Sequence, residues 1–178
     1  MNGDKITLID HHDNEPLHTG HSSQLDDKVK IRFPLTRGPE GYPPVEFETL
    51  WATPAGDGYF AIDNIPFFVV GVSCFDIVQA RHIGNKLYSF EDLVIPKGHS
   101  TLRVLFYETT DDTRPVLERA RDLIRNLRTL GCTSEISHIP DLISVDVPPE
   151  VELARVRNIL DAGNAADLWE YEEATLAT

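Results

Sequence analysis

Cysteine, methionine and tryptophan are scarce in this chain of 178 residues, which holds 2, 1 and 2 of them. Two cysteines, Cys74 and Cys132, are too few for a disulfide framework, and this favours a reducing compartment. No apolar run approaches the roughly 20 residues of a membrane-spanning helix, and the first residues lack the basic and apolar regions of a secretory signal. The sequence therefore predicts a cytoplasmic protein without a membrane span.

Positive charge is also in short supply. Against 29 Asp and Glu stand 16 Lys and Arg, which leaves a net charge of −13 at pH 7 and a pI near 4.8. Nucleic acids and anionic lipids attract proteins mainly through Lys and Arg, so this balance argues against both as partners. An acidic chain is instead suited to a basic protein partner.

Five arginines nevertheless crowd one predicted helix, at positions 114, 119, 121, 125 and 128. Two interpretations stay open. Glu118 and Asp122 can pair with some of them on a solvated helix face. Alternatively, the arginines form a local stripe that binds an anion such as RNA, which the net charge disfavours.

Motifs that carry catalytic or cofactor chemistry are missing. The chain holds no GxxxxGK[ST], GxSxG, HExxH or CxxC, and no GxGxxG after a predicted strand.

Four of the seven histidines lie in the first 27 residues, but their spacing matches no zinc module. Cys74 has apolar neighbours, which makes it a poor nucleophile for His82. His99 and Ser100 are adjacent on a predicted strand, where their side chains point to opposite faces. We therefore expect no enzyme, no cofactor and no metal.

The first 97 residues divide into two parts. Residues 1–27 are polar and acidic, with one apolar segment (Ile6-Thr7-Leu8-Ile9), and predict a flexible arm. Residues 28–97 alternate in the manner of strands, predicted at 28–33, 45–52, 59–63, 74–80 and 86–94. In the second strand, Val45, Phe47, Thr49 and Trp51 share one face, and Glu46, Glu48 and Leu50 the other. Gly56-Asp57-Gly58 predicts a hairpin turn. We predict a small antiparallel β-sheet or barrel here.

Residues 98–178 change to mixed periodicity. A strand at 101–107 is followed by a helix from Val116 to Leu130, with its N-cap at 111–113 and a stop at Gly131. Strands at 134–139 and 142–147, a helix starting at 148–150 and ending at 161–164, and a strand at 168–174 complete the order. This βαββαβ order predicts a split βαβ, ferredoxin-like plait. The predicted fold class is thus α+β, with the β half first.

Several segments of the chain together resemble a bacterial family known as a domain of unknown function (number four-two-six-five). They are residues 29–35, 42–46, 48–52, 56–59, 63–68, 98–104 and 170–174, so the resemblance covers about residues 29–176 and leaves the arm outside. The family has no assigned activity. Small acidic bacterial proteins without catalytic motifs often look like immunity proteins, which bind a secreted toxin and block its active site. Acidic proteins also associate rapidly with basic ones.

The first function hypothesis is a non-enzymatic protein-binding module, most specifically an immunity-type inhibitor of a basic toxin or effector. The candidate contacts are Asp57, Tyr59, Asp63, Asn64, Glu91, Asp92, Trp169 and Glu170, although Trp169 is equally compatible with a core position. The second hypothesis is a small-ligand-sensing or dimerising regulatory module built on the plait, so both a monomer and a homodimer stay open. An RNA-associated factor using the arginine-rich helix is a weaker third.

Overall fold

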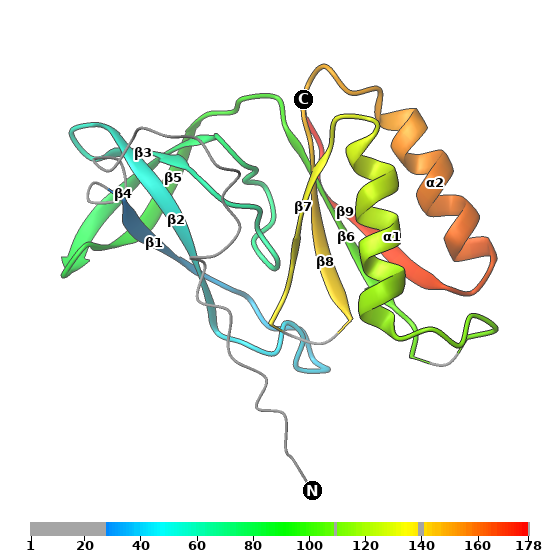
Figure 1. Cartoon of the computed structure of the whole chain (residues 1–178). Helices are drawn as coiled ribbons and strands as arrows, with labels where there is room; N and C mark the ends of the chain where they lie inside the picture. The colour runs from blue at the N-terminus through cyan, green and yellow to red at the C-terminus, as the bar shows by residue number, and fades with distance from the viewer. Residues whose placement is uncertain (1–27, 109, 139–140, 178) are drawn as a thin grey trace, which may run out of the picture.

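The computed structural model describes residues 28–108, 110–138 and 141–177. The arm predicted for residues 1–27, with its apolar segment and its histidines, lies outside this range. Within it the chain is a mixed α+β protein with two sheets and two helices, and most of its regular elements are strands (Figure 1). From one side to the other, the layers are a barrel, a sheet and a pair of helices.

The first five strands form a closed barrel: β1 (Val29–Pro34), β2 (Phe47–Gly56), β3 (Tyr59–Ile62), β4 (Ile77–Gly84) and β5 (Leu87–Ile95). The predicted alternation of the first strand is confirmed, since Val29, Ile31 and Phe33 are buried in the barrel core. Neighbouring strands pair antiparallel, but β1 and β5 close the barrel as a parallel pair, which corrects the wholly antiparallel prediction. Closing the barrel satisfies the backbone groups that two sheet edges would expose.

The second sheet has the order β7-β8-β6-β9 and carries both helices on one face (Figure 1). Its elements are β6 (Ser100–Phe106), α1 (Val116–Arg128), β7 (Thr133–Ile136), β8 (Leu142–Val147), α2 (Leu153–Ala165) and β9 (Trp169–Thr175). Alternate residues of β6 and β8, including Leu102, Val104 and Val145, join Leu123 and Leu127 of α1 in one apolar core. Each helix has 13 residues, and neither is long and apolar enough to cross a membrane.

The N-cap of α1 and the start of α2 differ from the sequence prediction. Helix α1 begins at Val116 as predicted, but its N-cap is Pro115 instead of a residue of 111–113. Arg114 precedes a proline, which disfavours the helical conformation at that residue, and Asp112 binds the Arg114 side chain and backbone N–H outside the helix. Helix α2 begins at Leu153, later than the predicted start at 148–150. A residue that precedes proline is pushed out of the helical region, and this disfavours a helix through Pro148-Pro149.

Candidate binding groove

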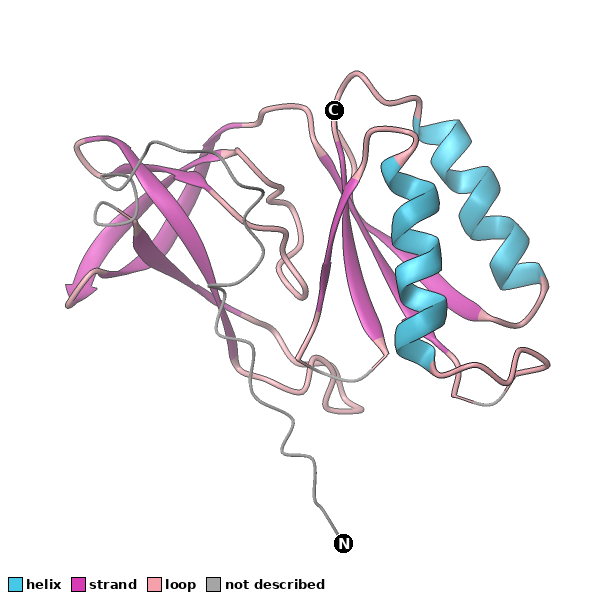
Figure 2. Ribbon diagram, viewed as in Figure 1, coloured by secondary structure: helices cyan, strands magenta, loops and turns pink. Residues whose placement is uncertain are grey.

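The face of the second sheet that is turned toward the barrel is polar. Strand alternation places Thr101 and Arg103 of β6, and Ser144 and Asp146 of β8, on this side, and all four are buried. An irregular segment, residues 63–76, runs between barrel and sheet (Figure 2). Ser144 Oγ donates to the Pro66 carbonyl at 2.6 Å, and Thr101 Oγ1 donates to Ser73 Oγ at 3.0 Å. Hydrogen bonds therefore hold the sheet to this segment.

Glu48 of β2 holds the same segment from the barrel side. Its carboxylate accepts hydrogen bonds from the backbone N–H groups of Phe67, Phe68 and Val69 at 2.7–2.8 Å. Three N–H groups on one anion form a charge-assisted cluster that fixes the local backbone. Glu48 is therefore a structural residue that joins the barrel to this segment.

His99 and Asp146 form a second contact near the junction of the two halves. His99 Nδ1 lies 2.8 Å from Asp146 Oδ1, and the Phe75 ring packs edge-on against the imidazole. Burial raises the pKa of Asp146, and the His99 contact opposes this rise. Ser100 Oγ accepts from the Ala177 N–H. His99 and Ser100 thus have different partners, and the structure does not bring them together as a base and a nucleophile.

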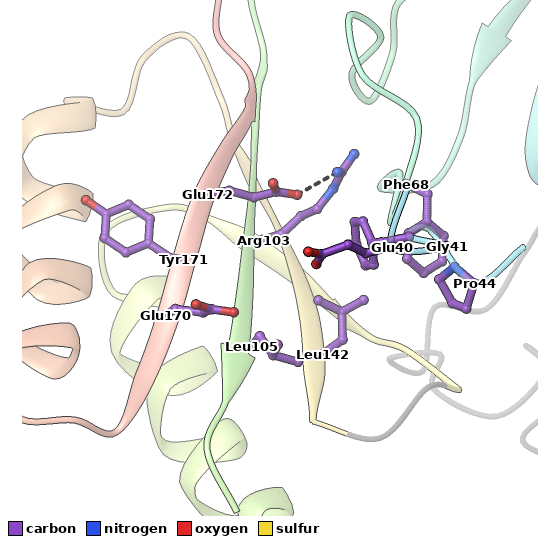
Figure 3. A pocket seen from close by; sticks show the side chains of 11 residues that line it. Glu40, Gly41, Pro44, Phe68, Arg103, Leu105, Leu142, Glu170, Tyr171 and Glu172 are labelled. Carbon is purple, nitrogen blue, oxygen red and sulfur yellow. Dashed lines mark hydrogen bonds and ion pairs between the residues drawn. The ribbon is translucent and has the colours of Figure 1, made fainter. Parts of the chain in front are cut away.

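An open groove of about 770 Å³ lies where the loop before β2 meets the barrel-facing side of the sheet (Figure 3). Its apolar lining comes from Tyr42, Pro44, Phe68, Leu105 and Leu142. Glu40 and Gly41 supply the loop side, and Arg103, Glu170, Tyr171 and Glu172 the sheet side.

Arg37 gives the loop side of the groove a fixed shape. Its guanidinium donates from Nη2 to the Gly41 carbonyl at 2.9 Å and from Nε to the Pro43 carbonyl at 3.1 Å. Gly41 has a φ of +82°, a conformation that glycine adopts without steric cost. The Tyr42 ring packs edge-on against Phe68, with the centroids 6.0 Å apart. The loop is therefore braced both internally and against residues 63–76.

The groove is acidic. Of the described residues that line it, Arg103 is the only cation, and it is 4% exposed and bonded to Glu172 Oε1 at 2.6 Å and to the Val69 carbonyl at 2.5 Å (Figure 3). Glu40 and Glu170 are exposed and form no ion pair with any residue that the structure describes. Burial, and next the charge of Glu172, raises the pKa of Tyr42. Two unpaired carboxylates therefore border a groove whose one cation is neutralised.

Of the eight candidate contacts, three lie together on the outer face of the barrel. Tyr59 pairs in register with Gln79, and Gln79 with Asp92, so Tyr59 and Asp92 lie two strands apart on one exposed surface. Asp57 is exposed in the adjoining turn. Glu91 is the residue before Asp92 on β5, and it forms an exposed ion pair with Arg81 at 3.2 Å.

The remaining candidates have different environments. Asp63 pairs with Lys28 at 2.6 Å, and Asn64 Oδ1 accepts from the Trp51 N–H at 2.8 Å, so both stabilise the barrel. Trp169 is 8% exposed and donates from Nε1 to the Leu160 carbonyl, which corrects its placement among surface contacts. Glu170 alone of the eight lines the groove.

Sequence reasoning missed Glu40, Tyr42, Arg103 and Glu172. Tyr42, Arg103 and Glu172 lay within segments quoted for the family resemblance, but nothing local marks them as neighbours. A usable signal was the alternation Glu170-Tyr171-Glu172, which places two carboxylates on one face of the last strand. Their opposition to Glu40 depends on the tertiary fold.

No three His, Cys, Asp or Glu side chains cluster as a metal site within residues 28–108, 110–138 and 141–177. Both cysteines are buried and unpaired. Burial raises the pKa of the Cys74 thiol to about 12 and that of Cys132 to about 11. A thiol with such a pKa is almost wholly protonated at neutral pH, and so it is a weak nucleophile and a weak ligand.

Comparison with known families confirms the resemblance seen in the sequence. The family model described as a domain of unknown function (DUF4265) matches residues 48–171, and the chain belongs to this family. A crystal structure of a hypothetical protein from Neisseria gonorrhoeae has the same fold, with a TM-score of 0.67 and 22% identity. The match covers 85% of this chain and 96% of that one. No curated protein matches the chain.

Proposed function

We propose that this protein is a non-enzymatic binding module that holds a basic protein partner on its acidic surface. An immunity-type inhibitor, which blocks the active site of a basic toxin or effector, is the most specific form of the proposal. The observation that carries it is the groove: an apolar floor bordered by two carboxylates, Glu40 and Glu170, that pair with no cation in the described part of the chain.

A lysine or arginine side chain fits this arrangement. Its aliphatic stem can lie on Leu105 and Leu142 while its charged head reaches Glu170 or Glu40. Each such contact removes apolar surface from water and pairs a charge in a partly enclosed site, where attraction exceeds that on an open surface. The net charge of −13 adds long-range attraction and speeds association with a basic partner.

Two of the five arginines between positions 114 and 128, Arg114 and Arg125, have carboxylate partners, and this supports a protein partner over RNA. Arg114 binds both Asp112 and Asp122, at 2.6 Å and 2.5 Å, and Arg125 also contacts Asp122. Arginines that already have carboxylate partners contribute less to binding phosphate.

We also assign the second half to the ferredoxin-like class. The support is its element order β6-α1-β7-β8-α2-β9, with a sheet order of β7-β8-β6-β9 and both helices on one face. We place the protein in the cytoplasm, which its two free buried cysteines favour.

The test compares two double variants with the same change in charge. Glu40→Lys/Glu170→Lys alters the groove, and Glu91→Lys/Asp92→Lys alters the barrel face. Each is assayed by titration calorimetry against the basic protein that pulls down with the full chain at low salt. We expect the groove variant to lose at least roughly tenfold in affinity and the barrel variant less than roughly threefold. Equal losses, or no basic protein bound at low salt, would overturn the proposal.

The groove volume also supports the second candidate, a small-ligand-sensing or dimerising module. Its size of about 770 Å³ falls within the range of small-molecule sites. A ligand that binds only the native state raises its melting temperature. A metabolite that raises the melting temperature of the wild-type chain but not of Glu170→Lys would favour this candidate.

A further inference from the structure

Strand β9 is an edge of the second sheet, and its hydrogen-bonding pattern shows which backbone groups face outward. In an antiparallel pair, residues that exchange hydrogen bonds alternate with residues that do not. The Tyr107 N–H donates to the Leu168 carbonyl at 3.1 Å, and the register joins Leu105 to Glu170 and Arg103 to Glu172. These are hydrogen-bonded pairs. The N–H and C=O groups of Trp169, Tyr171 and Glu173 therefore point away from β6.

The opposite side of β6 gives an independent check. The Phe106 N–H donates to the Asp141 carbonyl at 2.8 Å, on the side of β8. Even-numbered residues of β6 thus bond toward β8, and odd-numbered ones toward β9. In the described part of the chain, β9 pairs with β6 and with no other strand. Its outer edge can accept a further strand.

The two faces of β9 differ in how far their polar groups are satisfied. On the helix side, the Tyr171 hydroxyl donates to Asp161 at 2.5 Å, and Arg157 pairs with Glu173 at 2.5 Å. On the barrel side, Glu170 has no ion-pair partner among the residues that the structure describes, and Glu172 is 53% exposed beside Arg103. The groove borders β9 at Glu170, Tyr171 and Glu172 and so extends to the sheet edge.

We propose that an extended segment of the basic partner adds to the outer edge of β9 as a fifth strand, with Lys or Arg at alternate positions on the groove side. Backbone hydrogen bonds to Trp169, Tyr171 and Glu173 supply its register. The alternate basic side chains lie beside Glu170 and Glu172, because residues two apart on a strand share a face and are about 6–7 Å apart. This inference rests on the proposed function and names the form in which the partner binds.

The negative charge of β9 argues against two other occupants of its outer edge, a second copy of β9 and the apolar segment near the start of this chain. If β9 paired with a second copy of itself, Glu170 and Glu172 of both copies would crowd one face, and opposed like charges destabilise a sheet. The apolar segment Ile6-Thr7-Leu8-Ile9 of this chain has a single adjacent basic residue, Lys5, set between Asp4 and Asp10, and so it lacks basic residues at alternate positions. A segment with basic residues at every second position meets no such repulsion.

The first experiment uses the full wild-type chain and a synthetic peptide of roughly ten residues, with lysine at alternate positions and valine or threonine between. The matched control peptide carries glutamate in place of each lysine. Amide hydrogen exchange is followed by NMR. We expect the lysine peptide, and not the control, to slow exchange at Trp169, Tyr171 and Glu173. Slowed exchange is the signature of new backbone hydrogen bonds at those sites.

A pair of variants at one position separates the backbone contact from the side-chain contact. Tyr171→Pro and Tyr171→Ala both remove the bond to Asp161, but only proline also removes the outward N–H. Proline is tolerated on an edge strand where its nitrogen faces solvent. We expect the peptide to bind Tyr171→Pro roughly tenfold more weakly than Tyr171→Ala.

The outcomes are distinct. Peptide binding that weakens in Glu170→Lys, with no slowed exchange at the three amides, would overturn strand addition and leave the proposed function standing. Equal affinity of the two Tyr171 variants would have the same meaning. Absence of binding by the lysine peptide at low salt, together with failure of the charge-reversal test above, would overturn both.

Discussion

Replacing Arg103 with alanine is the sharpest test of how barrel and sheet are held together. The guanidinium is 4% exposed and links Glu172 to the Val69 carbonyl. Its removal leaves that carbonyl without its donor, which costs about 1–3 kcal/mol when the group is buried. Loss of the ion pair adds at most about 1 kcal/mol, because Glu172 is 53% exposed and regains water. We expect Arg103→Ala to lower the free energy of unfolding by roughly 1–4 kcal/mol.

Glu172→Gln is the matched comparison. Glutamine keeps an oxygen that accepts from Arg103, and the position is half exposed, so we expect a loss below about 1 kcal/mol. Urea unfolding followed by circular dichroism measures both variants, with the slope m as a check that the two-state description holds. At about 3 °C per kcal/mol, Arg103→Ala should melt roughly 3–12 °C lower than the wild type. A loss below about 1 kcal/mol for Arg103→Ala, or equal losses in the two variants, would refute the reasoning.

Three further predictions concern the buried framework. Gly163→Ala places a Cβ 1.8 Å from the Trp169 ring, so we expect a loss of at least about 1–3 kcal/mol in thermal unfolding and an altered near-ultraviolet signal; wild-type stability would contradict it. Glu48→Gln replaces a carboxylate oxygen that faces the N–H groups of residues 67–69 with an amide group, and we expect it to lower the free energy of unfolding in urea by about 1.5–3 kcal/mol. A change below about 0.5 kcal/mol would show that residues 67–69 keep their conformation without the carboxylate. Cys74 and Cys132, whose burial raises their pKa values to about 12 and about 11, should react with a thiol reagent at pH 8 only after denaturant is added; rapid labelling of the native protein would show that they are accessible.

Elements with a one-sided apolar pattern were predictable from sequence. Strand β8 was predicted at 142–147 and lies at Leu142–Val147, and the helix predicted from Val116 forms α1, Val116–Arg128. In both, packing on one face follows from local periodicity. Strand β2 has apolar residues on both faces. Leu50 and Ala52 are buried in the barrel, whereas Phe47, on the other face, is exposed. Local alternation could not choose the inner face.

The candidate site was less predictable than the fold. Glu170 was chosen for its charge and proves to line the groove. Its neighbours Glu40 and Arg103 come from distant parts of the chain, and only the packing of the loop on the sheet brings them together. Burial also separates side chains of one chemical type, since Trp169 packs in the core while Tyr42 faces the groove.

Taken alone, the amino-acid sequence determined the charge of the surface, the family, the order of strands and helices, and the lack of the catalytic motifs sought. Each of these depends on composition or on neighbours along the chain. Only the tertiary structure decided which carboxylates are already bonded, as Glu48 and Glu173 are, and which form no ion pair with the residues that the structure describes, as is true of Glu40 and Glu170. Whether a charged group has a partner depends on distances of a few ångströms between segments far apart in sequence, and no local pattern encodes those distances.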